Sequence, residues 1–463
     1  MTKRIVIGGA SSNVGKTTFT LGLMKAMVKR GLKTQGFKTG PDYIDPAFHT
    51  HVTGCKSRNL DSWMLDEESI KHLYNINSSG KDVSIIEGVM GMYDGFSGDM
   101  SLGSTAHLSK ILRAPIILLI DGSGVAASAA AVVLGFSMLD RDVNLAGVVI
   151  NNVHGEKHYN ILKSAIEKYT QVKCFGYLSK NSKIKLESRH LGLIPSVEVE
   201  TLDEKIDIIA SMVEETVDVD AILNCGSDDE LEVDYSFNNL VLIKENIGKF
   251  EGVNIGVAFD SSFNFYYQDN LDLFEQLGAK IIYFSPLKDK EIPASIDGLY
   301  IGGGFPEIFA KELSDNTTMI SSIKKASDNG MPIYAECGGL MYLLDEIVDI
   351  EEKTRKLCGL ISGTSHMTKR LQRFGYVEVE TKENSIIGNK GLAFKAHEFH
   401  RSKVESNENT AYNVVKKRET DETEWTCGYY KENILAAYAH NHFYSNPNIA
   451  INLLTSLKKY KND

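Results

Sequence analysis

Short apolar runs alternate with amphipathic stretches along the first half of the chain. The run Ala114–Ile120 is almost uninterrupted, which is typical of a central parallel strand that is buried on both faces. In Thr18–Arg30, apolar residues recur instead at helical spacing. This alternation predicts an α/β domain with a mostly parallel sheet and helices on both faces. The predicted strands are Arg4–Ile7, Leu32–Lys38, Val83–Ile86, Ala114–Ile120, Leu145–Ile150 and Cys174–Leu178, and helix Thr201–Val217 is expected to close this half.

The alternation is interrupted at residues 224–239, an acidic segment that reads NCGSDDELEVDYSFNN and has no regular periodicity. We therefore expect two domains, at residues 1–235 and 245–463. A second strand–helix alternation follows and predicts another α/β domain of the same class. Its expected strands are Asn254–Phe259, Lys280–Phe284, Gly298–Ile301, Pro332–Ala335 and Ile434–Ala439, and its expected helices are Asn270–Leu277 and Leu340–Leu344.

The composition narrows the class of protein. The 463 residues are 43% hydrophobic and 24% charged, as in a globular protein that is long enough for two domains. The formal net charge of -11, without a cluster of Lys and Arg, argues against a nucleic-acid partner. Six cysteines without paired metal spacing indicate neither a disulfide framework nor a zinc site. With no apolar run near the length of a membrane span, we expect a cytoplasmic small-molecule enzyme with no membrane partner.

The segment GGASSNVGKTT joins the first predicted strand to the first predicted helix, as a phosphate-binding loop does. Its backbone amides would cradle phosphates, Lys16 would reach the β- and γ-phosphates, and Thr17 would hold Mg²⁺. The loop is a variant, because Ala10 stands where the first glycine is usual and Gly9 comes one place earlier. Ser11 stands where partitioning-type ATPases carry an additional lysine. The residues expected to bind ATP are Gly9, Asn13, Gly15, Lys16, Thr17 and Thr18.

Charged residues follow two further strands of the first half. Lys38, Asp42 and Asp45 lie in FKTGPDYIDP, and Glu87 and Asp94 lie in EGVMGMYDG. Ligands gather at the carboxyl ends of strands in sheets of this kind, so these groups should face the phosphates and a second substrate. Mg²⁺ takes few protein carboxylates, which suits this set, although Asp in a loop often only caps a turn. The expected metal ligands are Thr17, Asp45 and Glu87, and the expected substrate or phosphoryl-transfer residues are Lys38, Asp42, Tyr43 and Asp94.

The segment YAECGGL in the second half resembles a strand–turn–helix elbow that carries a nucleophile. Gly338 and Gly339 permit a tight turn after Cys337, and the N-terminus of the following helix should favour the thiolate. The alternative is a buried core cysteine. Backbone amides of GGGFPE and of the elbow are candidates for an oxyanion hole. The expected oxyanion residues are Gly303, Gly304 and Gly338.

Two histidine-containing segments are candidates for the general base that Cys337 needs. HNHFYSNP contains His440 and His442, and the period of a strand puts both on one face, so spacing does not choose between them. In AHEFHRS, Glu398 and His400 share one strand face and His397 lies on the other. A single histidine is more often a hydrogen-bonded structural residue than a catalytic one.

Nine motifs in this order resemble the cobyrinic acid a,c-diamide synthase family along nearly the whole chain: GGASSNVGKTT, FKTGPDYIDPAFH, RNLDSWM, EGVMGMYDG, AFDSSFNFYYQDNL, YIGGGFPE, AECGGLMYL, HEFHRS and AYAHNHF. The resemblance implies a dethiobiotin-synthetase-like ATPase domain followed by a class I glutamine amidotransferase domain. Carried over onto this chain, Cys337 is the nucleophile and His440 is its base. Related triads often carry glutamate two residues after the histidine, where this chain has His442, so the third member stays open.

The family implies an activity in cobalamin biosynthesis. Ammonia from L-glutamine would convert the a and c carboxylates of cobyrinic acid to amides, through acyl phosphates formed with ATP and Mg²⁺. Tyr43 and His190 are candidates for lining the tetrapyrrole pocket, and Asn151 and Asn152 for reading the adenine edge. Oligomeric state stays open.

Three other activities remain to be weighed. A nickel sirohydrochlorin a,c-diamide synthase resembles this family throughout and would use the same site residues. Cobyric acid synthases more often read YLHGLF where this chain reads YAHNHF. A partitioning-type ATPase switch is disfavoured by Ser11 and by the presence of both Cys337 and His440.

Overall fold

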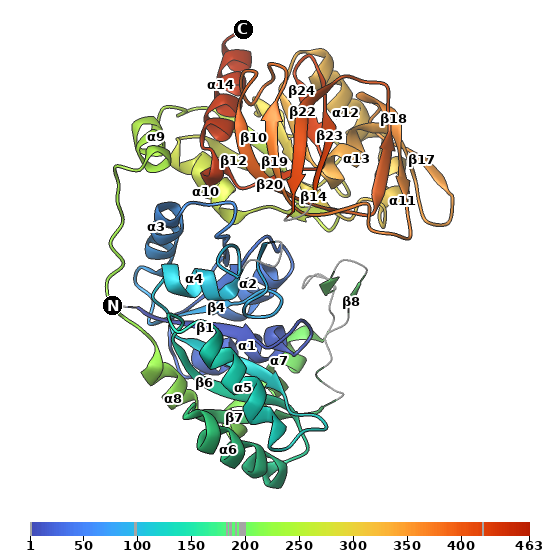
Figure 1. The fold of residues 1–463 in the computed structure, drawn as a ribbon. Helices are drawn as coiled ribbons and strands as arrows, with labels where there is room; N and C mark the ends of the chain where they lie inside the picture. Colours follow the sequence, from blue (N-terminus) through green and yellow to red (C-terminus); the bar gives the residue numbers. More distant parts are fainter. Residues whose placement is uncertain are drawn as a thin grey trace. The chain divides into compact units, whose positions relative to one another are not determined.

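The structure, a computed structural model, describes residues 2–96, 100–181, 184, 188–189, 192–193, 201–418 and 421–463. The chain divides into two units, Met1–Asp234 and Tyr235–Asp463 (Figure 1). His190, a predicted pocket residue, lies outside the described residues. Within the described ranges, no helix is long and apolar enough to cross a membrane.

The first unit is built on a seven-stranded sheet with the order β3-β2-β4-β1-β5-β6-β7. Every neighbouring pair is parallel, and the apolar run of β5 is buried as its sequence predicts. The strands are β1 Lys3–Gly9, β2 Thr34–Thr39, β3 Arg58–Leu60, β4 Val83–Glu87, β5 Ile116–Asp121, β6 Leu145–Val153 and β7 Cys174–Ser179; β8 Ser188–Arg189 and β9 Gly192–Leu193 form a separate pair.

Helices cover both faces of this sheet, which confirms the predicted fold class. Helix α1 packs against α2 and α7, and α5 packs against α6. Side-chain caps fix several helix starts, since Asp66 accepts a hydrogen bond from the Ser69 amide and Ser104 accepts one from the His107 amide. The helices are α1 Lys16–Lys29, α2 Asp45–Thr53, α3 Glu67–Ser78, α4 Thr105–Ile111, α5 Ser128–Leu139, α6 Glu156–Thr170, α7 Leu202–Thr216 and α8 Val219–Cys225.

The second unit is built on a ten-stranded sheet with the order β12-β10-β13-β15-β24-β23-β22-β19-β20-β25. From β12 to β24 the strands are parallel, and this part contains the predicted strands. From β23 onward they are antiparallel, which the sequence pattern did not predict. The strands are β10 Asn254–Ala258, β12 Lys280–Phe284, β13 Gly298–Ile301, β15 Ile333–Glu336, β19 Arg373–Thr381, β20 Ala393–His400, β22 Thr410–Lys417, β23 Glu422–Lys431, β24 Ile434–Ala437 and β25 His440–Asn441.

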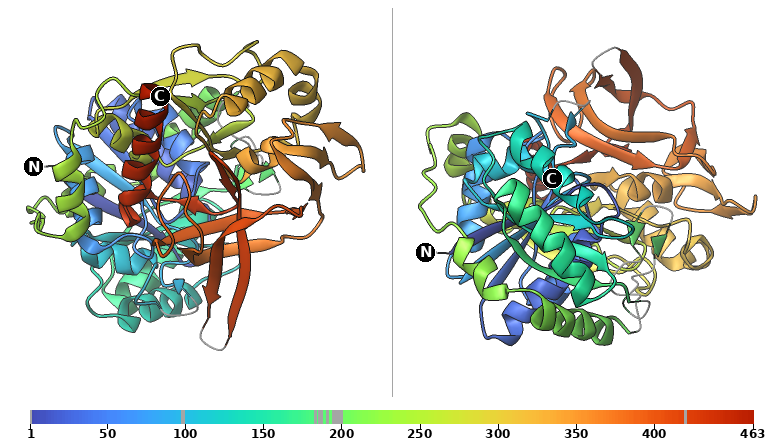
Figure 2. Two further views of the ribbon diagram at one scale, coloured as in Figure 1. Left: turned by 90° about the horizontal axis from the view of Figure 1, so that it is seen from above. Right: turned by 60° about the horizontal axis from the view of Figure 1, so that its bottom comes forward.

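The antiparallel part curls back on itself. Strand β25 follows β24 after only Tyr438 and Ala439, yet it pairs with β20 at the far end of the strand order. The sheet must therefore bend until β20 lies beside the chain that leaves β24. The β22–β23 hairpin extends from it as a long ribbon (Figure 2). This bend brings residues of β20 close to His440 and, through β24, to the elbow at Cys337.

Smaller elements complete the second unit. A four-stranded sheet has the order β17-β16-β18-β21, and β11 pairs with β14. These strands are β11 Phe263–Phe265, β14 Gly303–Gly304, β16 Leu344–Val348, β17 Thr354–Lys356, β18 Ile361–Met367 and β21 Ser402–Glu405. The helices are α9 Asn238–Asn246, α10 Gln268–Gln276, α11 Ala310–Asp315, α12 Thr317–Asp328, α13 Gly338–Leu343 and α14 Asn448–Asn462.

Candidate active sites

The predicted phosphate loop connects β1 to α1. Gly15 precedes the helix with φ 100°, and Asn13 also has a positive φ of 62°. The Asn151 side chain donates a hydrogen bond from Nδ2 to the Val14 carbonyl at 2.8 Å. A Cβ on Gly15 would lie 2.3 Å from that Nδ2 atom, so this position requires glycine both for its φ and for space. Asn151 thus supports the loop, and its contact to adenine stays a prediction.

Lys16 folds back over the loop. Its Nζ atom donates hydrogen bonds to the Ser11 carbonyl at 3.1 Å and to the Met90 carbonyl. A Cβ on Gly9 would lie 2.9 Å from Lys16 Cδ, so the lysine stem passes directly over Gly9. Burial, and secondly the charge of Lys38, lower the pKa of Lys16 to about 8. Thr18 is half-buried in the first turn of α1.

Thr17, Lys38, Asp45 and Glu87 converge, and we call them the Lys38 cluster. Lys38 Nζ lies 2.5 Å from Asp45 Oδ2 and 3.0 Å from Glu87 Oε1. Thr17 Oγ1 contacts the same two oxygens, at 3.3 Å and 2.6 Å respectively. The cluster therefore joins the helix α1, the carboxyl ends of β2 and β4, and the start of α2. The expectation that these strand ends bring the groups together is met in the structure.

The charges of the Lys38 cluster depend on one another. Burial alone would lower the pKa of Lys38, but Asp45 and Glu87 outweigh it and raise that pKa. Burial alone would raise the pKa of Glu87, but the charge of Lys38 and a hydrogen bond from His49 lower it. For Asp45, burial and the neighbouring Asp42 raise the pKa. Lys38 is thus an internal cation that compensates buried carboxylates.

His49 is a member of this site that the sequence analysis missed. It is fully buried, and its Nε2 atom lies 2.7 Å from Glu87 Oε2. Its Nδ1 atom lies 3.2 Å from Ser57 Oγ. His49 comes four residues after Asp45 on α2, and residues at that spacing share a helix face. The spacing within DPAFH was the available signal.

The other predicted residues of this half lie around the Lys38 cluster. Asp42 Oδ1 accepts hydrogen bonds from the backbone amides of Ile44 and Asp45, and its Oδ2 lies 3.8 Å from Lys38 Nζ. Asp94 accepts a hydrogen bond from the Gly91 amide at 2.8 Å, the turn-capping arrangement that was the alternative to a metal role. Tyr43 directly follows Asp42 in the chain, precedes α2, and is half-buried.

The donor set of the Lys38 cluster suits Mg²⁺. A hydroxyl and two carboxylates supply oxygen ligands, and Mg²⁺ is usually held by one or two carboxylates together with substrate phosphates. Thr17 Oγ1 already lies within hydrogen-bond distance of both carboxylates. Across the described residues, no group of three or more His, Cys, Asp and Glu side chains is arranged to hold a metal. Substrate phosphate oxygens and water would complete the coordination, as is usual for Mg²⁺.

In the second unit, Cys337 occupies a strained turn between β15 and α13. Its φ of 48° and ψ of -99° are rare for a residue with a side chain. The Cys337 amide donates to the Ala437 carbonyl at 2.7 Å, and the Gly339 amide donates to the Gly302 carbonyl at 3.0 Å. A Cβ on Gly339 would lie 2.2 Å from the Ile301 carbonyl oxygen, so the elbow packs directly against the backbone that follows β13. Strain of this kind is typical of functional sites.

The thiol does not have the lowered pKa that its position before a helix led us to expect. Burial raises the pKa of Cys337, and the carboxylates of Glu307 and Glu398 act in the same direction. A hydrogen bond involving the Gly338 amide lowers the pKa, as expected for the start of a helix, but its effect is smaller. The thiol is therefore protonated at neutral pH in this structure, and it needs a base.

The predicted oxyanion glycines and His440 lie beside the elbow. A Cβ on Gly338 would lie 3.0 Å from the Gly304 amide nitrogen. A Cβ on Gly303 would lie 2.5 Å from His440 Cε1 and 3.4 Å from its Nε2. The turn of β14 thus lies against both the elbow and the imidazole. Cys337, the three glycines and His440 are brought together in one unit.

Burial, followed by the charges of His397 and His400, lowers the pKa of His440 to about 3. The imidazole is therefore neutral at physiological pH and can accept a proton. His440 Nδ1 lies 3.8 Å from Glu336 Oε2. His442 lies elsewhere, with Nε2 3.7 Å from Asp269 Oδ2 and its ring 4.8 Å from that of Tyr267.

The first five residues of AHEFHRS end β20, and its Ser402 begins β21. His397 pairs directly with His440, and burial lowers the pKa of His397 to about 3. The His400 ring stacks on Tyr438 with centroids 3.6 Å apart. Glu398 is 1% exposed, and neither carboxylate oxygen has a hydrogen-bond partner in the part of the chain that the structure describes. The sequence analysis named Glu398 in a candidate segment but did not predict that its carboxylate is buried.

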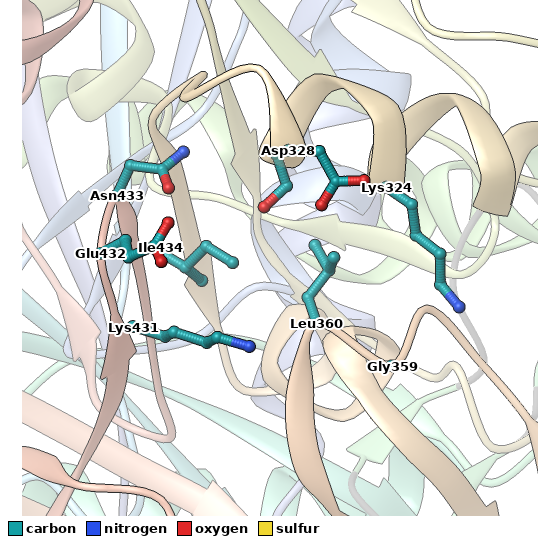
Figure 3. Close-up of a pocket in the computed structure, with 9 residues that line it drawn as sticks. Lys324, Asp328, Gly359, Leu360, Lys431, Glu432, Asn433 and Ile434 are labelled. Atoms are coloured by element: carbon teal, nitrogen blue, oxygen red, sulfur yellow. The ribbon is translucent and has the colours of Figure 1, made fainter.

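A pocket of about 230 Å³ lies elsewhere on the second unit (Figure 3). Its side chains carry charges of both signs, and no predicted site residue lines it. The lining residues are Lys324, Ser327, Asp328, Gly359, Leu360, Lys431, Glu432, Asn433 and Ile434.

Comparison with known proteins gives matches to both units. Residues 5–194 match the CobQ/CobB/MinD/ParA nucleotide binding domain, and residues 254–448 match the CobB/CobQ-like glutamine amidotransferase domain. The chain is similar to the cobyrinate a,c-diamide synthase of Listeria innocua, with 44% identity over 98% of this chain and 100% of that protein. It is also similar to the enzyme of that name from Clostridium acetobutylicum, with 46% identity over 96% of this chain and 98% of that protein.

Proposed function

The chain belongs to the cobyrinate a,c-diamide synthase family of glutamine-dependent amidotransferases, and from this premise we propose that it amidates the a and c carboxylates of cobyrinic acid. ATP and L-glutamine are the co-substrates. The observation that carries this proposal is the nearly full-length similarity to relatives of that name, across both the nucleotide-binding and the amidotransferase parts.

In the second unit, His440 removes the proton of the Cys337 thiol, and the sulfur attacks the side-chain amide carbon of glutamine. The amides of Gly303, Gly304 and Gly338 stabilise the oxyanion of the tetrahedral intermediate. The C–N bond breaks, the proton passes to the leaving nitrogen, and ammonia departs. Water activated by His440 then hydrolyses the thioester to glutamate and restores the thiol. The position of His440 beside Gly303, in the turn that borders the elbow, supports this role.

In the first unit, the tetrapyrrole carboxylate attacks the γ-phosphate of ATP, which gives an acyl phosphate and ADP. Ammonia then displaces phosphate and forms the amide. Lys16 and the loop amides would hold the phosphates, and Lys38 and Asp42 would face the attacking carboxylate. Mg²⁺ held by Thr17, Asp45 and Glu87 would neutralise phosphate charge when bound. The convergence of Thr17 and Lys38 on the same oxygens of Asp45 and Glu87 supports the assignment.

The test measures mass gain on cobyrinic acid and on nickel sirohydrochlorin, side by side, with ATP and glutamine. We expect two successive amidations of cobyrinic acid. Cys337→Ala should lose the reaction with glutamine and keep it with ammonium salt. Cys358→Ala, which changes another buried cysteine of the same unit, should keep both reactions.

The outcomes separate the remaining activities. Preference for the nickel compound would move the protein to the nickel pathway with its mechanism unchanged. ATP hydrolysis without amidation of either compound, and without ammonia release from glutamine, would indicate a switch ATPase and refute the proposal.

A further inference from the structure

The imidazole of His440 has two edges with different surroundings. Its Nδ1 atom faces Glu336 Oε2 at 3.8 Å, whereas the Cε1–Nε2 edge lies against Gly303 in the turn that borders the elbow. A base that accepts the thiol proton at one ring nitrogen is held in the correct tautomer by an acceptor at the other nitrogen. Glu336 is on the side of the ring where that acceptor is needed.

Glu336 is held rigidly in the second unit. It is 1% exposed, and Oε2 accepts a hydrogen bond from Tyr300 Oη at 2.9 Å. Oε1 accepts one from Tyr334 Oη at 2.8 Å and another from the Asn441 amide at 3.2 Å. The Asn441 bond ties the carboxylate to the residue that follows His440. Oε2 retains acceptor capacity beyond its bond to Tyr300, because a carboxylate oxygen has two lone pairs.

The position that carries glutamate in related triads cannot supply this acceptor. It is occupied by His442, whose Nε2 atom lies 3.7 Å from Asp269 Oδ2. His442 therefore faces another acid and provides no carboxylate to His440. Glu398, the other buried carboxylate of this region, lies 3.7 Å from Nε2 of His400. The carboxylate that faces His440 Nδ1 therefore comes from the residue immediately before the nucleophile.

We propose that Glu336 is the positioning residue of the glutaminase site, in the role that a glutamate two residues after the histidine fills in related triads. The inference rests on the proposed function of Cys337 and His440. Shortening the 3.8 Å separation by roughly 1 Å gives a normal hydrogen bond from Nδ1–H, and such bonds are often long before substrate binds. Glu336 then fixes the tautomer and stabilises the imidazolium that forms when the thiol is deprotonated.

The experiment measures glutamate formation from glutamine as a function of pH in the full-length protein. Glu336→Gln should lower kcat by about 10²–10⁴-fold and leave KM for glutamine within about threefold. Burial raises the pKa of Glu336 to about 7, so wild-type kcat/KM should fall as Glu336 gains a proton. This acidic limb should move to lower pH in Glu336→Gln, which has no carboxyl group to protonate. The titratable groups that face His440 from β20, His397 and His400, are unchanged in this variant.

Two further variants control for structure. Glu336→Asp keeps the charge and should give an intermediate rate with the acidic limb at the wild-type pH. Asp269→Asn removes the buried acid beside His442 and should leave the profile unchanged. In a Trp63→Phe background, an unchanged thermal transition of Trp425 fluorescence shows that the second unit of Glu336→Gln is folded.

The inference is overturned if Glu336→Gln stays within threefold of wild type, or if its rate falls without movement of the acidic limb. It is also overturned if Asp269→Asn produces the loss and the shift instead. Failure of the proposed function looks different: the wild type would release no ammonia, or Cys337→Ala would still release it.

Discussion

Lys38 offers the sharpest test of the charge balance in the first unit. Its ammonium lies 2.5 Å and 3.0 Å from two buried carboxylates, Asp45 and Glu87. Removing one partner of such a pair leaves a buried charge without compensation and costs about 3–5 kcal/mol. We therefore expect Lys38→Met to destabilise the first unit by about this amount, a fall in Tm of roughly 6–20 °C for a unit of this size.

The assay uses the distribution of tryptophan. The chain has two, Trp63 in the first unit and Trp425 in the second. In a Trp425→Phe background, the fluorescence of the buried Trp63 reports on the first unit alone. Lys29→Met is the matched control, because its ion pair with Asp207 is about half exposed on both sides and should be worth less than about 1 kcal/mol.

Proton binding and Mg²⁺ supply independent checks of the Lys38→Met variant. Burial raises the pKa of Asp45, and without Lys38 it would raise that of Glu87 too. The folded variant then binds protons more tightly than the unfolded chain, so its stability should rise as the pH falls from 8 to 5. Millimolar Mg²⁺ should raise its Tm more than that of the wild type, because the cation replaces the ammonium. A variant as stable as Lys29→Met, with no response to pH or Mg²⁺, would refute this reasoning.

Three further predictions concern single side chains. Gly303→Ala would place a Cβ 2.5 Å from His440 Cε1. Glutaminase activity should therefore fall by about 10²-fold, while ammonium-dependent amidation persists. Equal loss of both activities would count against a local effect. Thr17→Val should reduce ATP-dependent amidation by about 10–100-fold and Thr17→Ser should restore it, as measured at saturating ATP over a Mg²⁺ titration. Burial raises the pKa of Cys337, so its alkylation by iodoacetamide without glutamine should be slow at pH 7.5 and should accelerate with rising pH. Peptide mass mapping measures the labelling. Rapid, pH-independent labelling would contradict a buried, protonated thiol.

The parallel strands could be predicted because their signal is local. The predicted strand Val83–Ile86 is observed as Val83–Glu87, and Leu145–Ile150 is observed as Leu145–Val153. A strand that is buried on both faces needs an unbroken apolar run, and few other elements produce one. The antiparallel strands of the second unit lack this signal, since Arg373–Thr381 mixes exposed and buried positions. Their pairing depends on the bend of the sheet, which no short segment encodes.

In the candidate site too, features with a local sequence signal could be predicted, and features that depend on tertiary contacts could not. The convergence of Lys38, Asp45 and Glu87 could be predicted, because a parallel sheet collects its strand ends and the following loops at one edge. The same rule did not show that Lys38 compensates the two carboxylates, because a charge balance depends on burial and on distances between loops. Nor could helix position alone give the protonation state of Cys337, where desolvation outweighs the amide at the helix start.

The third member of the triad shows how strand order can replace a motif. Asn441 and Glu336 are 105 residues apart, yet the Asn441 amide donates to the Glu336 carboxylate. Strand β15 pairs with β24, where Glu336 is opposite Ala437, and the chain reaches His440 three residues later. The parallel pairing thus places the residue before the nucleophile beside the base. The acid that faces the imidazole Nδ1 atom can come from the strand of the base or from the neighbouring strand that carries the nucleophile. The absence of glutamate at position 442 therefore does not imply an incomplete triad.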